Sequence, residues 1–124
     1  MNDRPKLSTE VADCEGIPVV RVRGEIDLYT VPEFEHALNT GIERGGSALI
    51  ADLSNVSYLD SAGLSALLAA HKALSKRNSA LCLVVSPGRS TVRRVMEITR
   101  IDNLVKIWDS VEEAVRELRL SEAA

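Results

Sequence analysis

The 124-residue sequence predicts an α/β fold, a mixed sheet of about five strands flanked by about four helices. First, short apolar runs of the kind that form buried strands alternate with longer segments whose apolar residues recur at helical spacing. This alternation implies crossover connections and mostly parallel strand pairing. Second, two strand-like segments near the start are separated only by a turn, which predicts an opening hairpin. The expected order is β-β-α-β-α-β-α-β-α.

The first half of the chain supplies three strands and one helix. The expected strands cover 7–12, 19–23 and 48–53, and the helix covers 30–43. Thr30 and Glu33 have the spacing of a capping box, and Pro32 is tolerated in the first turn. Gly45 and Gly46 stop the helix. The alternating pattern of the second strand breaks at Gly24, where we expect the strand to end.

The second half predicts three more helices and two more strands. The helices cover 61–76, 90–98 and the segment from 110 onwards, and the strands cover 80–85 and 104–108. Ser110 and Glu113 form a second possible capping box. The apolar face of the first of these helices is expected to contain Leu64, Leu67, Leu68, His71 and Leu74.

Composition is ordinary for a soluble globular domain, with 45% hydrophobic and 27% charged residues. One domain over 1–124 is expected, with an aliphatic core because aromatic residues are only 3%. The net charge of −3 argues against nucleic acid as a partner. No apolar run approaches the roughly 20 residues of a membrane span, and no signal peptide is apparent, so a cytoplasmic protein without membrane insertion is expected. Cys14 and Cys82 are expected to be free thiols, Cys82 in a buried strand.

Signatures of catalysis are not found. The sequence has no phosphate-binding GxxxxGK[ST] loop, no GxGxxG after a strand and no GxSxG elbow. Its two histidines, His36 and His71, lie in predicted helices without clustered ligands. We therefore expect no enzyme activity, no catalytic residue, no cofactor and no metal.

The segment 52–64 joins a buried strand to the start of a helix. Asp60 and Ser61 are both good N-cap residues, and small Ala62 and Gly63 follow. One interpretation is that Asp60 or Ser61 simply caps the helix. The other is that Ser61 offers its hydroxyl to a kinase, beside helix N–H groups that favour anions. A phosphate there would add about −1.5 to −2 charge units.

Two motifs in this order resemble those of STAS-domain anti-sigma factor antagonists. One is Asp60-Ser61-Ala62-Gly63-Leu64, preceded by Asp52-Leu53-Ser54-Asn55-Val56, and the other is Gly24-Glu25-Ile26-Asp27. The resemblance covers about 7–118 and implies one STAS domain. Ser65 departs from the pattern, because many members have Gly after the motif Gly-Leu.

The resemblance implies a switch without catalysis of its own. The unphosphorylated protein would bind an anti-sigma factor that is also a serine kinase, and so free the sigma factor. Phosphorylation of Ser61 would release the complex, and a serine phosphatase would reset it. The residues implied to lie at the partner-facing surface are Asp27, Asp60, Ser61, Ala62 and Gly63.

Two other functions stay open. The chain could be a STAS subunit of another regulatory or transport-associated complex, without partner switching. It could also be a small enzyme that uses Asp27 and Asp60 as paired carboxylates, which would need a pocket and a difference between their pKa values. Ser54, Ser57 and Ser65 lie close enough to Ser61 to be confused with it in mapping a phosphate.

Overall fold

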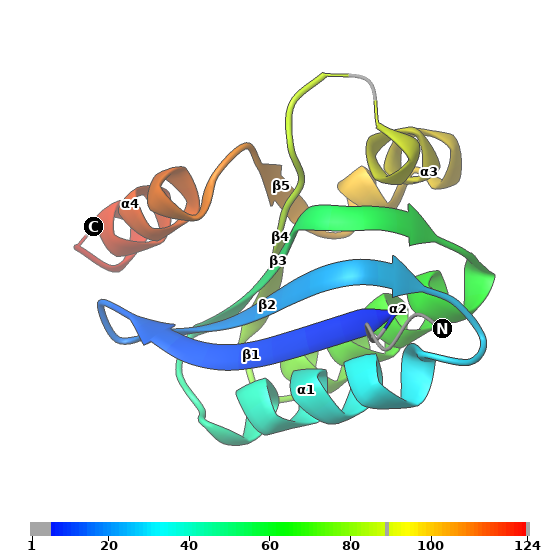
Figure 1. Cartoon of the computed structure of the whole chain (residues 1–124). Helices are drawn as coiled ribbons and strands as arrows, with labels where there is room; N and C mark the ends of the chain where they lie inside the picture. Colours follow the sequence, from blue (N-terminus) through cyan, green and yellow to red (C-terminus); the bar gives the residue numbers. More distant parts are fainter. Residues whose placement is uncertain (1–5, 89, 124) are drawn as a thin grey trace.

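The computed structural model describes residues 6–88 and 90–123 and contains one five-stranded sheet in the order β1-β2-β3-β4-β5 (Figure 1). The strands are β1 (Leu7–Cys14), β2 (Ile17–Ile26), β3 (Ala48–Leu59), β4 (Ala80–Val84) and β5 (Lys106–Trp108). The helices are α1 (Val31–Glu43), α2 (Ser61–Ser75), α3 (Thr91–Thr99) and α4 (Val111–Ala123), with a 3₁₀ turn at Ile101–Asn103. β1 and β2 are antiparallel and the other neighbours are parallel. The predicted fold class and element order are confirmed.

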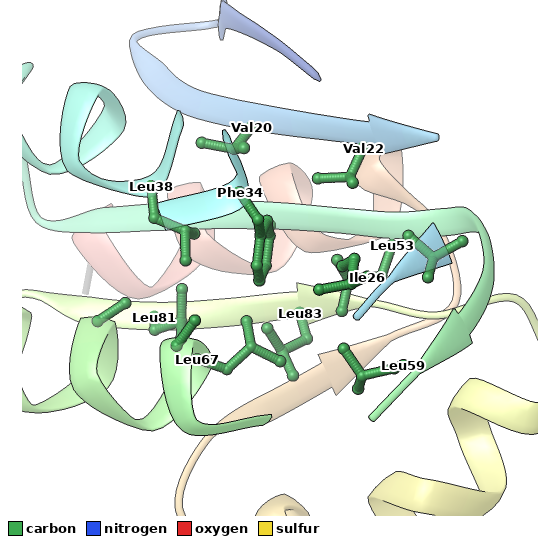
Figure 2. Close-up of a cluster of buried hydrophobic side chains, with 14 of the residues drawn as sticks. Val20, Val22, Ile26, Phe34, Leu38, Leu53, Leu59, Leu67, Leu81 and Leu83 are labelled. Carbon is green, nitrogen blue, oxygen red and sulfur yellow. The ribbon is translucent and has the colours of Figure 1, made fainter. Parts of the chain in front are cut away.

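Helices cover the two faces of the sheet unequally. In Figure 1, α1 and α2 lie below the sheet and α4 lies above it. The larger core fills the α1/α2 side, where Phe34, Leu38 and Leu67 point toward Val20 and Leu81 of the strands (Figure 2). The predominance of Leu, Val, Ile and Ala in this cluster matches the predicted aliphatic core.

A smaller core fills the α4 side. It joins residues of three strands to one face of α4, namely Ile17, Val19, Ile50, Cys82, Val84, Val111, Ala114 and Val115. Successive residues of a strand point to opposite faces, so Val19 belongs to this cluster and Val20 to the larger one. The continuous apolar runs in the sequence are explained by this burial on both faces.

β2 does not end where the alternation breaks, so that prediction is wrong. Gly24 has φ +114° and lies between two register shifts in the pairing with β3. A Cβ on Gly24 would overlap the backbone oxygen of Lys6. The strand therefore passes through an irregularity that only glycine fits, and resumes pairing at Glu25 with Tyr58.

β3 is also longer than predicted, because the polar segment after residue 53 continues the strand. Asp52 is buried, and its Oδ1 accepts the Ser54 N–H at 3.0 Å and the Ser54 hydroxyl at 2.6 Å. Val56 and Leu59 are buried while Ser57 is exposed. Pairing with β2 satisfies the backbone N–H and C=O groups of this segment whatever its side chains are. The polar side chains therefore do not end the strand.

The predicted face of α2 is partly wrong. Leu67 and Leu74 are buried and Leu64 packs against the core, but Leu68 is 38% exposed. Ala66 and Ala70 are buried instead. α2 packs against α1 as well as the sheet, and the small alanines lie where the two helices approach closely. This contact turns the buried stripe away from Leu68.

Serines cap α3 and α4, as predicted for Ser110 at α4, whereas the cap predicted for α1 is not formed. Ser90 and Ser110 cap their helices by accepting the N–H groups of Arg93 (3.0 Å) and Glu113 (3.1 Å). Thr30 precedes α1 without a side-chain cap bond, so the predicted capping box is wrong. β5 is shorter than expected because the N–H groups of Leu104 and Val105 donate to the Ile101 carbonyl, which keeps these two residues in the turn that follows the 3₁₀ segment.

Candidate functional site

Two loops of the candidate site meet at one end of the sheet. β2 and β3 are parallel neighbours, and Ile26 pairs with Leu59 at their last residues. The Asp60 N–H continues this contact by donating to the Ile26 carbonyl at 3.2 Å. The β2–α1 loop and the β3–α2 junction therefore lie side by side, at the right of Figure 1.

Asp60, and not Ser61, caps α2. Its Oδ1 accepts the N–H groups of Ala62 at 2.9 Å and Gly63 at 3.3 Å. Ser61 is the first residue of the helix and its side chain is exposed. Within the described residues, its hydroxyl makes no hydrogen bond. The two interpretations drawn from the sequence therefore apply to different residues: Asp60 caps the helix, and the neighbouring Ser61 offers an exposed hydroxyl.

Gly63 lets the start of α2 pack directly against the ends of β2 and β3. It is buried, and a Cβ on it would overlap Leu59 Cδ1 and lie 2.7 Å from Ile26 Cγ2. Ala62 beside it is partly exposed. The helix can approach the strand ends closely only because residue 63 has no side chain. Gly63 therefore contributes to the site by bringing Ser61 against the sheet end, rather than by an exposed surface.

Asp27 folds the β2–α1 loop. Its Oδ1 accepts the N–H groups of Tyr29 at 2.9 Å and Thr30 at 3.0 Å, and its Oδ2 lies 3.4 Å from Lys6 Nζ. The Thr30 hydroxyl accepts the Asp27 N–H at 2.9 Å and donates to the Glu25 carbonyl at 2.8 Å. The Thr30 backbone N–H, with those of Tyr29 and the charge of Lys6, holds the pKa of Asp27 below its usual value.

Three residues of this surface were not predicted from the sequence. Leu28 is 68% exposed and Tyr29 is 85% exposed, directly after Asp27. The available signal was a pair of bulky apolar residues between a strand-ending Asp27 and Thr30, belonging to neither periodic pattern. Lys6, which pairs with Asp27, was also missed, because its partner lies 21 residues away.

Other serines near Ser61 differ in their environment. Ser57 is exposed in β3, and its hydroxyl donates to the Gly24 carbonyl at 3.4 Å. Ser65 is exposed on α2, four residues after Ser61. Ser54 is partly buried and bonded to Asp52. Ser65 therefore remains the closest comparison for phosphate mapping, because it too is an exposed hydroxyl.

The hydrogen bonds of Asp27 and Asp60 do not support an acid–base pair. Asp27 and Asp60 each bond backbone N–H groups a few residues downstream. A general acid needs a raised pKa, whereas that of Asp27 is lowered. Over residues 6–88 and 90–123, no group of three or more His, Cys, Asp or Glu is placed to hold a metal ion. No helix in the same residues has the length and apolar character to cross a membrane.

Comparison with known proteins agrees with this geometry. The model of the STAS domain family matches residues 8–114. An anti-sigma-B factor antagonist from Staphylococcus aureus is 36% identical over 106 residues, which are 86% of this chain and 96% of that protein. One from Listeria monocytogenes is 40% identical over 86 residues, 69% of this chain and 74% of that protein.

A solved structure shows the same likeness in three dimensions. The crystal structure of an anti-sigma factor antagonist from Mycobacterium paratuberculosis has a TM-score of 0.83 and 34% identity, covering 91% of this chain and 94% of that chain. The mixed five-stranded sheet and the family match together define a STAS fold. This chain belongs to the STAS domain family, as the Asp60–Leu64 and Gly24–Asp27 motifs predicted.

Proposed function

We propose that this chain is an anti-sigma factor antagonist controlled by phosphorylation of Ser61. In the unphosphorylated form it binds an anti-sigma factor that is a serine kinase, and the sigma factor is released. The relatives named as anti-sigma-B factor antagonists support the class of function. The observation that carries the residue assignment is the exposed, unbonded Ser61 hydroxyl at the first position of α2.

The chemistry asked of Ser61 is that of a substrate. The kinase transfers the γ-phosphoryl group of ATP to Ser61 Oγ, with loss of the hydroxyl proton and release of ADP. A bound kinase can reach the hydroxyl because the side chain is exposed and makes no hydrogen bond to residues 6–88 or 90–123. A phosphatase hydrolyses the ester and restores the hydroxyl.

The α2 N-terminus gives a phosphate on Ser61 little compensation. The N–H groups of Ala62 and Gly63 already donate to Asp60. Lys6, which directly precedes β1, is paired with Asp27. A phosphate of about −1.5 to −2 charge units therefore adds to two existing carboxylates and stays hydrated at the surface. We infer that it destabilises an interface built around a neutral hydroxyl, while leaving the free fold intact.

The test compares binding and folding in matched variants. Each serine kinase of the anti-sigma class from the source organism is titrated with wild type, Ser61→Ala, Ser61→Asp and the control Ser65→Ala. Wild type, Ser61→Ala and Ser65→Ala should bind alike, and Ser61→Asp should bind at least about tenfold more weakly. All four should melt within about 2 °C of one another, since position 61 is exposed.

Phosphate mapping completes this test. With ATP, wild type and Ser65→Ala should gain one phosphate per chain, and Ser61→Ala should gain none. Phosphate on Ser57 or Ser65, or full binding by Ser61→Asp, would show that the switch residue is wrongly assigned.

The same proposal makes the chain a regulator without turnover. Homogeneous protein incubated with ATP or GTP should release no phosphate above the buffer rate. The reasons are that the sequence has no GxxxxGK[ST] phosphate loop and that the described residues hold no group of three metal-ligating side chains. Robust turnover that follows the protein through successive columns would contradict the proposal.

A further inference from the structure

The β2–α1 loop presents two bulky apolar side chains to solvent. Leu28 and Tyr29, here called the apolar tip, are 68% and 85% exposed. Single exposed apolar residues are common on protein surfaces. Here two adjacent ones at a loop apex leave most of their surface in water in the free chain. Their exposure is therefore not explained by the stability of the fold.

The loop that carries the apolar tip is held in one shape. Asp27 Oδ1 accepts the Tyr29 and Thr30 N–H groups, and the Thr30 hydroxyl links the Asp27 N–H to the Glu25 carbonyl. The Val31 N–H also donates to the Asp27 carbonyl at 2.9 Å. A side chain on such a clamped loop loses less conformational entropy when a partner binds it.

The surroundings of the apolar tip indicate the chemistry of its partner. Asp27 and Asp60 lie at the same end of the sheet, and exposed Glu33 lies in the first turn of α1. Asp27 is already paired with Lys6 at 3.4 Å, so a partner's cations would face Asp60 and Glu33. A protein that covers the tip must offer an apolar pocket for Tyr29 and a rim of Lys or Arg for these two carboxylates. Tyrosine suits this use because it combines a large apolar area with few rotatable bonds.

We propose that the apolar tip is the anchor of the anti-sigma factor complex, with Tyr29 inserted into an apolar, basic-rimmed pocket of the anti-sigma factor. This inference rests on the proposed function. The tip is next to the Ser61 surface, because the Asp60 N–H bonds the Ile26 carbonyl two residues before Leu28 (Figure 1). The apolar tip would supply binding affinity by burying apolar surface in the complex. Ser61 would regulate the complex, because phosphorylation adds charge beside the tip.

The test uses the anti-sigma factor kinase that binds wild type in the titration above. Tyr29→Ala should weaken binding by about 30-fold or more, the range of interface hot spots, and Leu28→Ala by a smaller factor. Ile98→Ala and Leu120→Ala are matched controls, because these side chains are 69% and 60% exposed on α3 and α4. Both controls should bind within about twofold of wild type, and all four variants should melt like wild type.

Each contrary outcome has a distinct meaning. If no anti-sigma factor kinase binds wild type, the proposed function fails and the anchor fails with it. If wild type binds but Tyr29→Ala binds within about threefold of it, the function stands and the anchor is wrong. If wild type sediments as a dimer that Tyr29→Ala dissociates, and kinase affinity is unchanged, the tip joins two copies of this chain and the proposal is overturned.

Discussion

Asp27 and Asp60 show the same local device at the ends of two neighbouring parallel strands. Each carboxylate follows the last residue of its strand and accepts two backbone N–H groups from the next turn. At Asp60 this starts a helix, and at Asp27 it closes a loop. Each of the two family motifs contributes one of these aspartates, and the direct role of each is to fix the local backbone conformation. Their consequence for function is the placement of Ser61 and Tyr29.

The lowered pKa of Asp27 predicts an acid-dependent contribution to stability. Bonds from the Thr30 and Tyr29 N–H groups favour the charged form in the folded chain, so its pKa lies below the ordinary 3.8. The unfolded chain then binds more protons in this range, so stability decreases as the pH is lowered. The contribution is fully present above pH 3.8 and is lost as pH falls through the lower folded pKa.

Urea unfolding of wild type and Asp27→Asn from pH 7 to 2.5 measures this contribution. Wild type should be the more stable at pH 7, and the difference should shrink below about pH 4. Glu33→Gln, a change at an exposed carboxylate, serves as the control. A difference between wild type and Asp27→Asn that stays constant down to pH 2.5 would contradict the assigned hydrogen bonds.

Gly63 is the position where a single methyl group should disturb the site. In a helix, Gly→Ala normally stabilises by about 1 kcal/mol. Here the new Cβ would overlap Leu59 and crowd Ile26, and overpacking typically costs about 1–3 kcal/mol. Gly63→Ala should therefore unfold at lower urea than wild type, whereas the exposed Ser65→Ala on the same helix should not. A more stable Gly63→Ala protein would show that α2 can shift freely off the strand ends.

At the scale of elements, α2 shows how a second helix redirects an apolar pattern. Its leucines alone predict a face that includes Leu68, yet Ala66 and Ala70 are buried and Leu68 is 38% exposed. Small residues permit close approach of α1, so the buried surface of α2 spans two directions, toward the sheet and toward α1. Leu68 lies outside both.

Two leucines that are adjacent in sequence test this orientation. Leu67→Ala removes a fully buried side chain and should cost about 2–5 kcal/mol of unfolding free energy. Leu68→Ala removes one that is 38% exposed and should cost about 1 kcal/mol or less. The two variants have the same composition, so each is the control of the other. Equal losses in chemical unfolding would contradict the packing of α2.

At the scale of the whole molecule, α4 covers the face of the sheet opposite α1 and α2. Cys82 in β4 is buried within this smaller core, while Cys14 at the end of β1 is partly exposed. Burial raises the pKa of the Cys82 thiol, which keeps it in its less reactive protonated form. Cys82 lies inside the smaller core and Cys14 packs against its partly exposed edge, so the two thiols differ in how well this core protects them.

Thiol labelling of the native protein should proceed in two phases. Cys14 should react fast, and Cys82 only as fast as the smaller core opens. Val115→Ala, which weakens the packing of α4 on the sheet, should speed the slow phase and leave the fast phase unchanged. Cys82→Ser identifies the phases. Rapid reaction of both thiols in wild type would show that α4 does not protect this face.

The sequence by itself determined the order of elements, the opening hairpin, the aliphatic core and the segment that carries Ser61. These follow from local patterns, because hydrophobic spacing and turn residues act over a few positions. It could not decide whether Asp60 or Ser61 caps α2, since both residues suit the position. Tertiary structure assigns the cap to Asp60 and so leaves the Ser61 hydroxyl free.

Only the tertiary structure decided the extent of β2 and β3, the exposure of Leu68 and Tyr29, and the use of Thr30. Gly24 and the polar residues after Leu53 end no strand, because pairing between β2 and β3 supplies their backbone bonds. Thr30 resembles a cap, but its hydroxyl bonds Glu25 and Asp27 across the loop. In each case the deciding partner comes from another element or turn, and local pattern does not record which surface another segment covers.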